Sequence, residues 1–98
     1  MKYDIKRDGG NMLITVEGRM DALAMPDLQN DVKPGLADVS AITLDFSRVE
    51  YISSAGLRTM LWIFRNMKMG GTMKVINANA ITRQVFTVTG FNEIFTIE

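Results

Sequence analysis

The sequence predicts an α/β domain with one mixed β-sheet, helices packed mainly on one face, and elements in the order ββαβαβαβ. Two β-rich runs flank a Gly-Gly turn near the start of the chain. Helical and strand-like patterns then alternate, and no internal repeat, low-complexity tract or linker interrupts them. The 98 residues are therefore expected to form a single domain, residues 1–98.

The start of the chain predicts a β-hairpin. Residues 3–7 and 12–17 are expected to be strands, because Asp8-Gly9-Gly10-Asn11 between them is favourable turn chemistry. Gly18 is expected to end the second strand, and residues 19–21 are expected to begin a loop.

The next segment, residues 25–33, predicts a helix. Pro26 suits a first helical turn, where its missing N–H costs nothing, and Pro34-Gly35 disfavours continuation beyond Lys33. Leu36 is expected to pack after this break. The apolar residues on one face of the helix are Met25, Leu28 and Val32.

A largely apolar run, residues 41–46, predicts a third strand that is central in the sheet, and residues 47–52 are expected to be a connecting stretch. From Ser54 the apolar period becomes helical, and Gly70-Gly71 is expected to stop this helix. The apolar stripe of that helix consists of Leu57, Met60, Leu61, Phe64 and Met67.

The C-terminal part predicts a strand at 72–76, a helix at 80–89 and a last short strand at 94–97. Asn77-Ala78-Asn79 offers residues that can cap the start of the helix, and Gly90 suits the position after its end.

Composition excludes several function classes. The 11 basic residues balance the 11 acidic ones, and there is no basic stripe, which argues against nucleic-acid binding. Without cysteine or histidine the chain has no disulfides, no thiolate metal ligands and no histidine general base. No secretory signal is evident, and no apolar run approaches the ~18 residues of a membrane helix. We therefore expect a cytoplasmic protein without membrane insertion.

The segment Tyr51-Ile52-Ser53-Ser54-Ala55-Gly56-Leu57 is the expected working site, because its serines stand at the start of the best helix. A serine there caps the helix, which local sequence favours, but the same helix end also tolerates an anion. A phosphate on Ser54 would lie within reach of Arg58, four residues on. Ser54 is not expected to be a catalytic nucleophile, because no base or Ser-x-x-Lys pattern accompanies it.

Other polar residues carry weaker signals. Asp21 follows a strand and is expected to solvate a loop or cap the next helix, and Asp45 is expected to bond nearby loop N–H groups. No third carboxylate completes metal-ligand spacing with them, so no metal site and no cofactor are expected. Met60 and Met67 are expected in the core. Three further methionines could be exposed in a binding patch: Met20, Met25 and Met69.

The run from Asp45 to Leu57, Asp-Phe-Ser-Arg-Val-Glu-Tyr-Ile-Ser-Ser-Ala-Gly-Leu, resembles the signature of STAS domains of the stand-alone bacterial anti-sigma factor antagonist type. The family pattern ends in an apolar residue followed by Asp-Ser-Ser/Ala-Gly-Leu. The resemblance also covers residues 16–21, 70–75 and 85–91, and therefore nearly the whole chain. The one departure at the site is Ser53, which stands where the family usually has Asp.

The resemblance implies an anti-anti-sigma factor in a partner-switching pathway, not an enzyme. In its unphosphorylated form such a protein binds an anti-sigma factor that is also a GHKL-type serine kinase. Phosphorylation at the position of Ser54, with Ser53 as a secondary candidate, blocks binding, and a PP2C-type phosphatase restores it. The implied partner-binding residues are Met20, Asp21, Ser53, Ser54, Ala55, Gly56, Leu57 and Arg58.

Two alternative functions stay open at this point. STAS domains also occur as docking subunits of transporters or of stress-sensing complexes, where the same surface would bind constitutively. The second alternative is a regulatory module that binds a nucleotide or another anion at the helix end next to Ser54.

Overall fold

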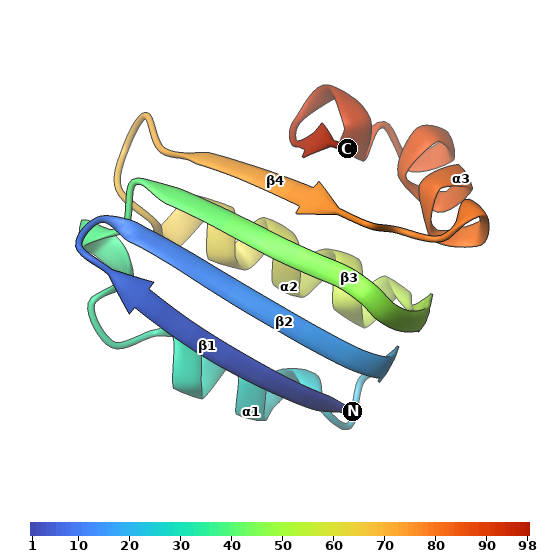
Figure 1. Ribbon diagram of the computed structural model, residues 1–98, viewed down its shortest axis with the longest axis horizontal. Coiled ribbons are helices and arrows are strands. Elements are labelled where there is room, and N and C mark those ends of the chain that lie inside the picture. The colour runs from blue at the N-terminus through green and yellow to red at the C-terminus, as the bar shows by residue number, and fades with distance from the viewer.

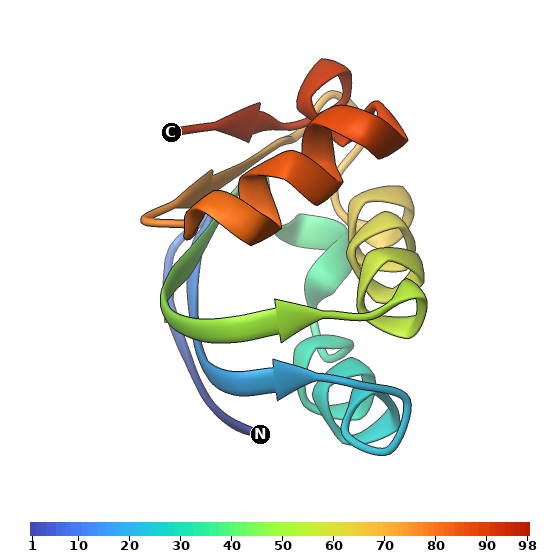
Figure 2. The ribbon, with the colours of Figure 1, turned by 90° about the vertical axis from the view of Figure 1, so that its right-hand side faces the viewer.

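The computed structural model describes residues 1–98 as a five-stranded sheet with helices on one side (Figure 1). Figure 2 shows the sheet edge-on, with the three α-helices on the same face of it. The predicted fold class and element order are confirmed. None of the helices is long and apolar enough to span a bilayer.

The elements are β1 (Lys2–Asp8), β2 (Asn11–Met20), α1 (Met25–Val32), a 3₁₀ turn (Leu36–Asp38), β3 (Ala41–Ile52), α2 (Ser54–Asn66), β4 (Thr72–Ile76), α3 (Ala80–Thr89), a second 3₁₀ turn (Phe91–Glu93) and β5 (Thr96–Ile97).

The strands lie in the order β1-β2-β3-β4-β5. β1 and β2 pair antiparallel as the predicted hairpin, and all later neighbours pair parallel. Parallel neighbours require crossover connections, which α1, α2 and α3 provide in turn. The predicted central position of β3 is confirmed.

Two predicted strand ends are wrong. β2 does not stop at Gly18 but continues to Met20, and β3 does not stop at Phe46 but runs through the expected connecting stretch to Ile52. The two extensions pair with each other in the sheet. This pairing stabilises both segments as strands, although the local sequence of each one does not favour a strand. Gly18 is accommodated with a φ of 95°, next to a register shift that has the character of a β-bulge.

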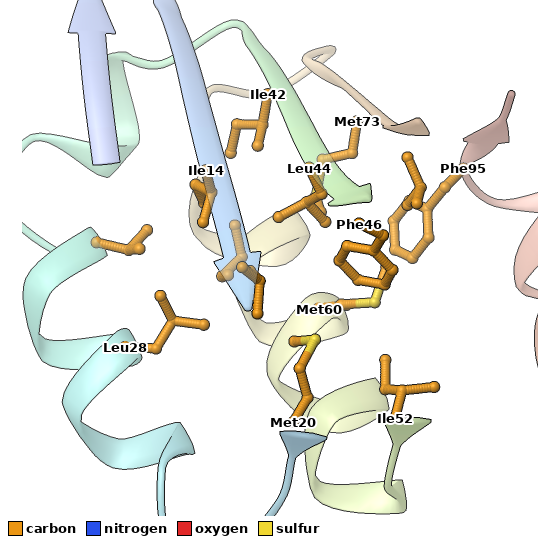
Figure 3. Packing of buried hydrophobic residues seen from close by; sticks show 14 of the residues in the cluster. Ile14, Met20, Leu28, Ile42, Leu44, Phe46, Ile52, Met60, Met73 and Phe95 are labelled. Carbon is orange, nitrogen blue, oxygen red and sulfur yellow. The ribbon is translucent and has the colours of Figure 1, made fainter. Parts of the chain in front are cut away.

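The core lies between the sheet and the helices, where side chains from all layers interdigitate (Figure 3). Met20 and Met25 are buried at 1% and 3% exposure, so their predicted exposure is wrong, whereas Met69 is exposed as expected. On α2 the buried face is rotated from the predicted apolar stripe. Met60 and Met67 lie in the core as predicted, together with Gly56, Thr59 and Ile63, while Leu57, Leu61 and Phe64 are only partly buried.

Strand β4 and helix α3 have the predicted bounds. The Asn79 side chain accepts a hydrogen bond of 2.8 Å from the backbone N–H of Thr82, and Gly90 adopts the left-handed conformation after the helix. Phe91 then packs back on Phe86, with ring centroids 6.2 Å apart. The predicted last strand is shortened to Thr96–Ile97, because the backbone N–H groups of Ile94 and Phe95 donate to the carbonyl oxygen of Phe91 at the end of a 3₁₀ turn.

Side-chain hydrogen bonds to residues far away in the sequence hold β1 against the end of α1. The Tyr3 hydroxyl donates a hydrogen bond of 2.5 Å to Asp31, and the Arg7 guanidinium donates to the carbonyl oxygens of Pro34 and Gly35 at 2.6 and 3.0 Å. The bond to Asp31 is also the main reason that the pKa of Tyr3 is raised to about 12. These contacts hold the edge strand β1 in place.

Asp45 forms a second polar link, within β3 and next to the loop after β4. Its carboxylate accepts hydrogen bonds from the backbone N–H of Ser47 at 3.0 Å and from the Asn77 amide at 3.3 Å. The predicted role in bonding nearby N–H groups is confirmed. The bond from Ser47 is the main cause that lowers the pKa of Asp45 below its ordinary value.

We expect Asp45→Asn to destabilise the domain at neutral pH, by no more than about 1 kcal/mol because the carboxylate is near solvent. A lowered pKa means that the stabilisation is present above the ordinary Asp range and is lost as pH falls through and below it. Urea unfolding of both proteins from pH 7 downward measures the difference. A difference that stays constant as pH falls would contradict the ionic origin of this effect.

Candidate functional site

The C-terminal ends of β2 and β3 meet the start of α2. Met20 and Ile52 are neighbours in the last register position of the two strands. The carbonyl oxygen of Met20 accepts two hydrogen bonds from Ser53, one from its backbone N–H at 3.0 Å and one from its hydroxyl at 2.7 Å. The beginning of α2 is therefore attached to the end of β2.

Ser53 is the N-cap residue of α2. Its backbone is extended, with φ −89° and ψ 173°, and its hydroxyl oxygen accepts a hydrogen bond of 3.3 Å from the N–H of Gly56. The same hydroxyl group donates to Met20, so both its donor and one acceptor site are occupied. The capping role that the sequence assigned to this pair of serines belongs to Ser53.

Ser54 is the first residue of α2 and is exposed. Its hydroxyl forms no hydrogen bond, in contrast to that of Ser53. It stands at the positive end of the helix dipole, where an anion is stabilised. Arg58, one turn further along α2, is also exposed and forms no salt bridge within the chain. An added negative group on Ser54 would find a free cation nearby.

Gly56 lets α2 approach the strands closely. A Cβ atom at this position would lie 2.7 Å from the Ile52 side chain and 3.1 Å from the backbone oxygen of Met20. Any larger residue would push the helix start away from the strand ends, and with it the serine pair.

The predicted partner-binding residues divide into three groups. Met20 and Gly56 are buried, so they support the surface rather than form it. Asp21 accepts hydrogen bonds from the backbone N–H groups of Leu23 and Ala24, which is the loop-capping role expected for it. Ser54 and Arg58 are exposed. The third group is partly exposed and consists of Asp21, Ser53, Ala55 and Leu57.

The structure adds three surface residues that the predicted partner-binding set omits. Leu23, in the loop between β2 and α1, is 91% exposed. Tyr51 is exposed, and the Arg19 guanidinium carbon lies 5.1 Å from its ring centroid, a cation–π arrangement across the paired ends of β2 and β3. Only the extension of both strands brings Arg19 and Tyr51 together, and that extension was not predicted.

The groove beside Ser54 is small. It lies between α1 and α2 and has a volume of about 200 Å³, below the roughly 300–1,000 Å³ of small-molecule sites. No three His, Cys, Asp or Glu side chains gather as metal ligands would. The surface therefore suits contact with a macromolecule better than enclosure of a small ligand. The groove is lined by Ala22, Met25, Pro26, Gln29, Ala55, Arg58 and Thr59.

We expect Ser53→Ala to cost about 1 kcal/mol of folding stability, because it removes the cap and the bond to Met20. Ser54→Ala is the matched control and should change stability by less than about 0.5 kcal/mol, because its hydroxyl has no partner. Chemical denaturation of the two variants tests this. Equal effects, or a larger effect at Ser54, would contradict the assignment of the cap.

Comparison with known proteins identifies the family of this chain. The family model described as "STAS domain" matches residues 2–98. The anti-sigma-B factor antagonist of Bacillus subtilis is 24% identical over 98 residues, which cover 99% of this chain and 90% of that protein. A crystal structure of an anti-sigma factor antagonist from Mycobacterium paratuberculosis has a TM-score of 0.84 at 23% identity, covering 98% of this chain and 83% of that one.

The fold is also that of the Bacillus cell fate determinant SpoIIAA in its phosphorylated form, with a TM-score of 0.78 at 18% identity over 99% of this chain and 91% of that one. The match of the family model to nearly every residue shows that the chain belongs to the STAS domain family, and anti-sigma factor antagonists are among its full-length relatives.

Proposed function

We propose that this domain is an anti-anti-sigma factor that binds an anti-sigma factor with serine kinase activity and is released when Ser54 is phosphorylated. The observation that carries the proposal is the unequal state of the two serines at the start of α2. Ser53 is held by Met20 and Gly56, whereas the Ser54 hydroxyl is exposed and unbonded. Only Ser54 can enter a kinase active site without breaking the cap.

In the proposed reaction this chain is the substrate. The Ser54 hydroxyl oxygen attacks the γ-phosphorus of ATP, the bond to the bridging oxygen breaks, ADP leaves, and a base of the kinase takes the hydroxyl proton. The kinase supplies ATP and Mg²⁺. A PP2C-type phosphatase hydrolyses the ester and returns the free hydroxyl.

The phosphate would change the surface without unfolding the domain. It brings a charge of about −1.5 to −2 at neutral pH to a helix N-terminus, a position that stabilises anions. Arg58 lies on the same side of the helix, one turn away, and can pair with it. A partner that relies on a neutral Ser54 surface or on a free Arg58 would then lose affinity.

Ser53 keeps the structural role of its position but not the usual charge. Asp and Ser are both good N-cap residues, so the exchange preserves the start of the helix. It removes one negative charge beside the phosphoacceptor, which makes the unphosphorylated surface less acidic. We propose that the cognate kinase accepts this neutral neighbour, and that Ser53 itself is not the main phosphoacceptor.

The exposed residues around Ser54 indicate the chemistry of the partner surface. Leu23 and Tyr51 offer apolar area, and Arg19 and Arg58 add positive charge at the same end of the domain. A complementary partner would present an apolar depression bordered by carboxylates. Leu23 is the side chain most open to insertion into such a depression.

Phosphorylation can be tested by incubating the protein with ATP and each GHKL-type serine kinase of its source organism, followed by phosphosite mapping with mass spectrometry. We expect one phosphate, on Ser54, and loss of incorporation in Ser54→Ala. Ser53→Ala, although less stable, should still be labelled when assayed well below its melting temperature. Labelling at neither serine would refute the switch and favour a constitutive docking role.

The mimic Ser54→Asp should weaken binding to the kinase that labels the protein, while the melting temperature changes by no more than about 2 °C. Titration calorimetry and a thermal melt measure the two effects. A large melting shift would instead point to a structural role for Ser54.

Leu23→Ser should reduce affinity for the same kinase by about tenfold or more, because an exposed apolar anchor is lost from the interface. Folding stability should hardly change, since the side chain is 91% exposed. Met69→Ser, at a residue that is 97% exposed in the loop after α2, is the matched control and should leave affinity unchanged. Titration calorimetry measures both. Equal affinities of the two variants would remove Leu23 from the docking surface.

A further inference from the structure

Strand β1 is a long free edge of the sheet. It pairs with β2 on one side only, over all seven of its residues and without a register shift. It contains no proline, and the opposite edge strand, β5, has only two residues. In an antiparallel strand every second residue directs its N–H and C=O away from the neighbour, so β1 leaves a row of backbone groups without strand partners.

The side chains of β1 alternate strictly in charge on the face away from the helices. Lys2, Asp4, Lys6 and Asp8 all point to this open face and are all exposed. None of them forms a salt bridge within the chain, whose two ion pairs join other residues. The intervening Ile5 faces the helix side, where it is only partly buried.

We propose that β1 pairs antiparallel with β1 of a second copy, around a two-fold axis at Ile5. In this register Lys2 lies opposite Asp8 of the second copy, and Asp4 lies opposite Lys6 of the second copy. Ile5 lies opposite its own counterpart, so apolar surface that is half-open in one copy is covered by the same residue of the other. The two sheets become one continuous sheet, with all helices on the same face.

The charges favour this register over the two nearest registers that keep all helices on the same face. A shift of two residues in one direction places Asp4 opposite Asp4 and Lys2 opposite Lys6. A shift in the other direction places Lys6 opposite Lys6 and Asp4 opposite Asp8. Like charges directly opposite each other in a sheet are destabilising, whereas opposite charges stabilise. A shift of one residue would turn the second sheet over and place its helices on the other side.

The pattern differs from the usual protection of a free edge. Edges are commonly kept apart by lysines or other like charges, by proline or by bulges, and β1 has neither proline nor a bulge. In the antiparallel two-fold arrangement, the alternating charges of β1 place no like charges opposite each other. The hydrogen bonds of Tyr3 to Asp31 and of Arg7 to Pro34 and Gly35 hold the strand on its helix side, so it is ordered before pairing.

Self-pairing leaves the Ser54 surface free. That surface lies at the C-terminal ends of β2 and β3 and at the start of α2, whereas the second copy would pair along the side of β1 that faces away from β2 (Figure 1). Dimerisation through β1 is therefore independent of the proposed function, and each can fail while the other stands.

The charge pattern allows a test by exchange of charges. Sedimentation velocity over a range of concentrations should show a monomer–dimer equilibrium for the native chain. Asp4→Lys places the introduced ammonium group opposite Lys6, and Lys6→Asp places the introduced carboxylate opposite Asp4. Each variant alone should therefore raise the dimer dissociation constant about tenfold or more. An equimolar mixture of the two variants should form a heterodimer, because every pair is then opposite in charge. The double variant should regain self-association.

Asp38→Lys and Lys68→Asp are matched controls, because they make the same charge changes at exposed positions outside β1. They should dimerise as the native chain does, alone or mixed. A native chain that stays monomeric at every concentration would overturn the proposal, and so would single variants that dimerise unchanged. Binding of an extended peptide to the edge of a monomeric chain would assign β1 to a different protein partner and would equally overturn it.

Discussion

The double hydrogen bond from Ser53 to the carbonyl oxygen of Met20 is the contact on which the candidate functional site of this domain depends. It joins the last residue of β2 to the N-cap residue of α2, and Gly56 allows the close approach that the contact requires. Because Met20 and Ile52 are paired in the sheet, the same contact also fixes the end of β3. Ser54, Tyr51 and Arg58 are thereby presented at the C-terminal ends of β2 and β3 by rigid elements rather than by a loose loop.

This contact separates two tasks that adjacent serines could otherwise share. A cap must keep its side chain folded back on the helix, whereas a phosphoacceptor must be able to leave the surface and enter another protein's active site. One hydroxyl cannot serve both without loss of the helix start. In this chain Ser53 provides the cap, so chemistry at Ser54 has a small cost in folding stability. The proposed switch is local for this physical reason: the phosphate changes charge at the helix end, not the packing below it.

The sequence allowed prediction of the elements whose signals are local. The bounds of β4 and α3 follow from their periodicity and from Asn79 and Gly90 at the helix ends. The prediction failed where pairing between distant residues decides. Gly18 and the polar stretch after Phe46 disfavour strands when each is considered alone, but they stabilise each other across β2 and β3. The contact of Arg19 with Tyr51 depends on those extensions, so it was not predictable either.

The alternating charges of β1 are visible in the sequence, but their meaning depends on the topology. In a central strand, or next to a helix, the same alternation would serve solubility alone. It becomes self-complementary only because the hairpin leaves β1 at an open edge. Antiparallel pairing there would point β2 and β3 of the two copies in opposite directions, and the two Ser54 surfaces with them. A single partner surface could not contact both Ser54 surfaces. The dimer would therefore carry two independent sites, and binding or phosphorylation at one site would gain no avidity from the other.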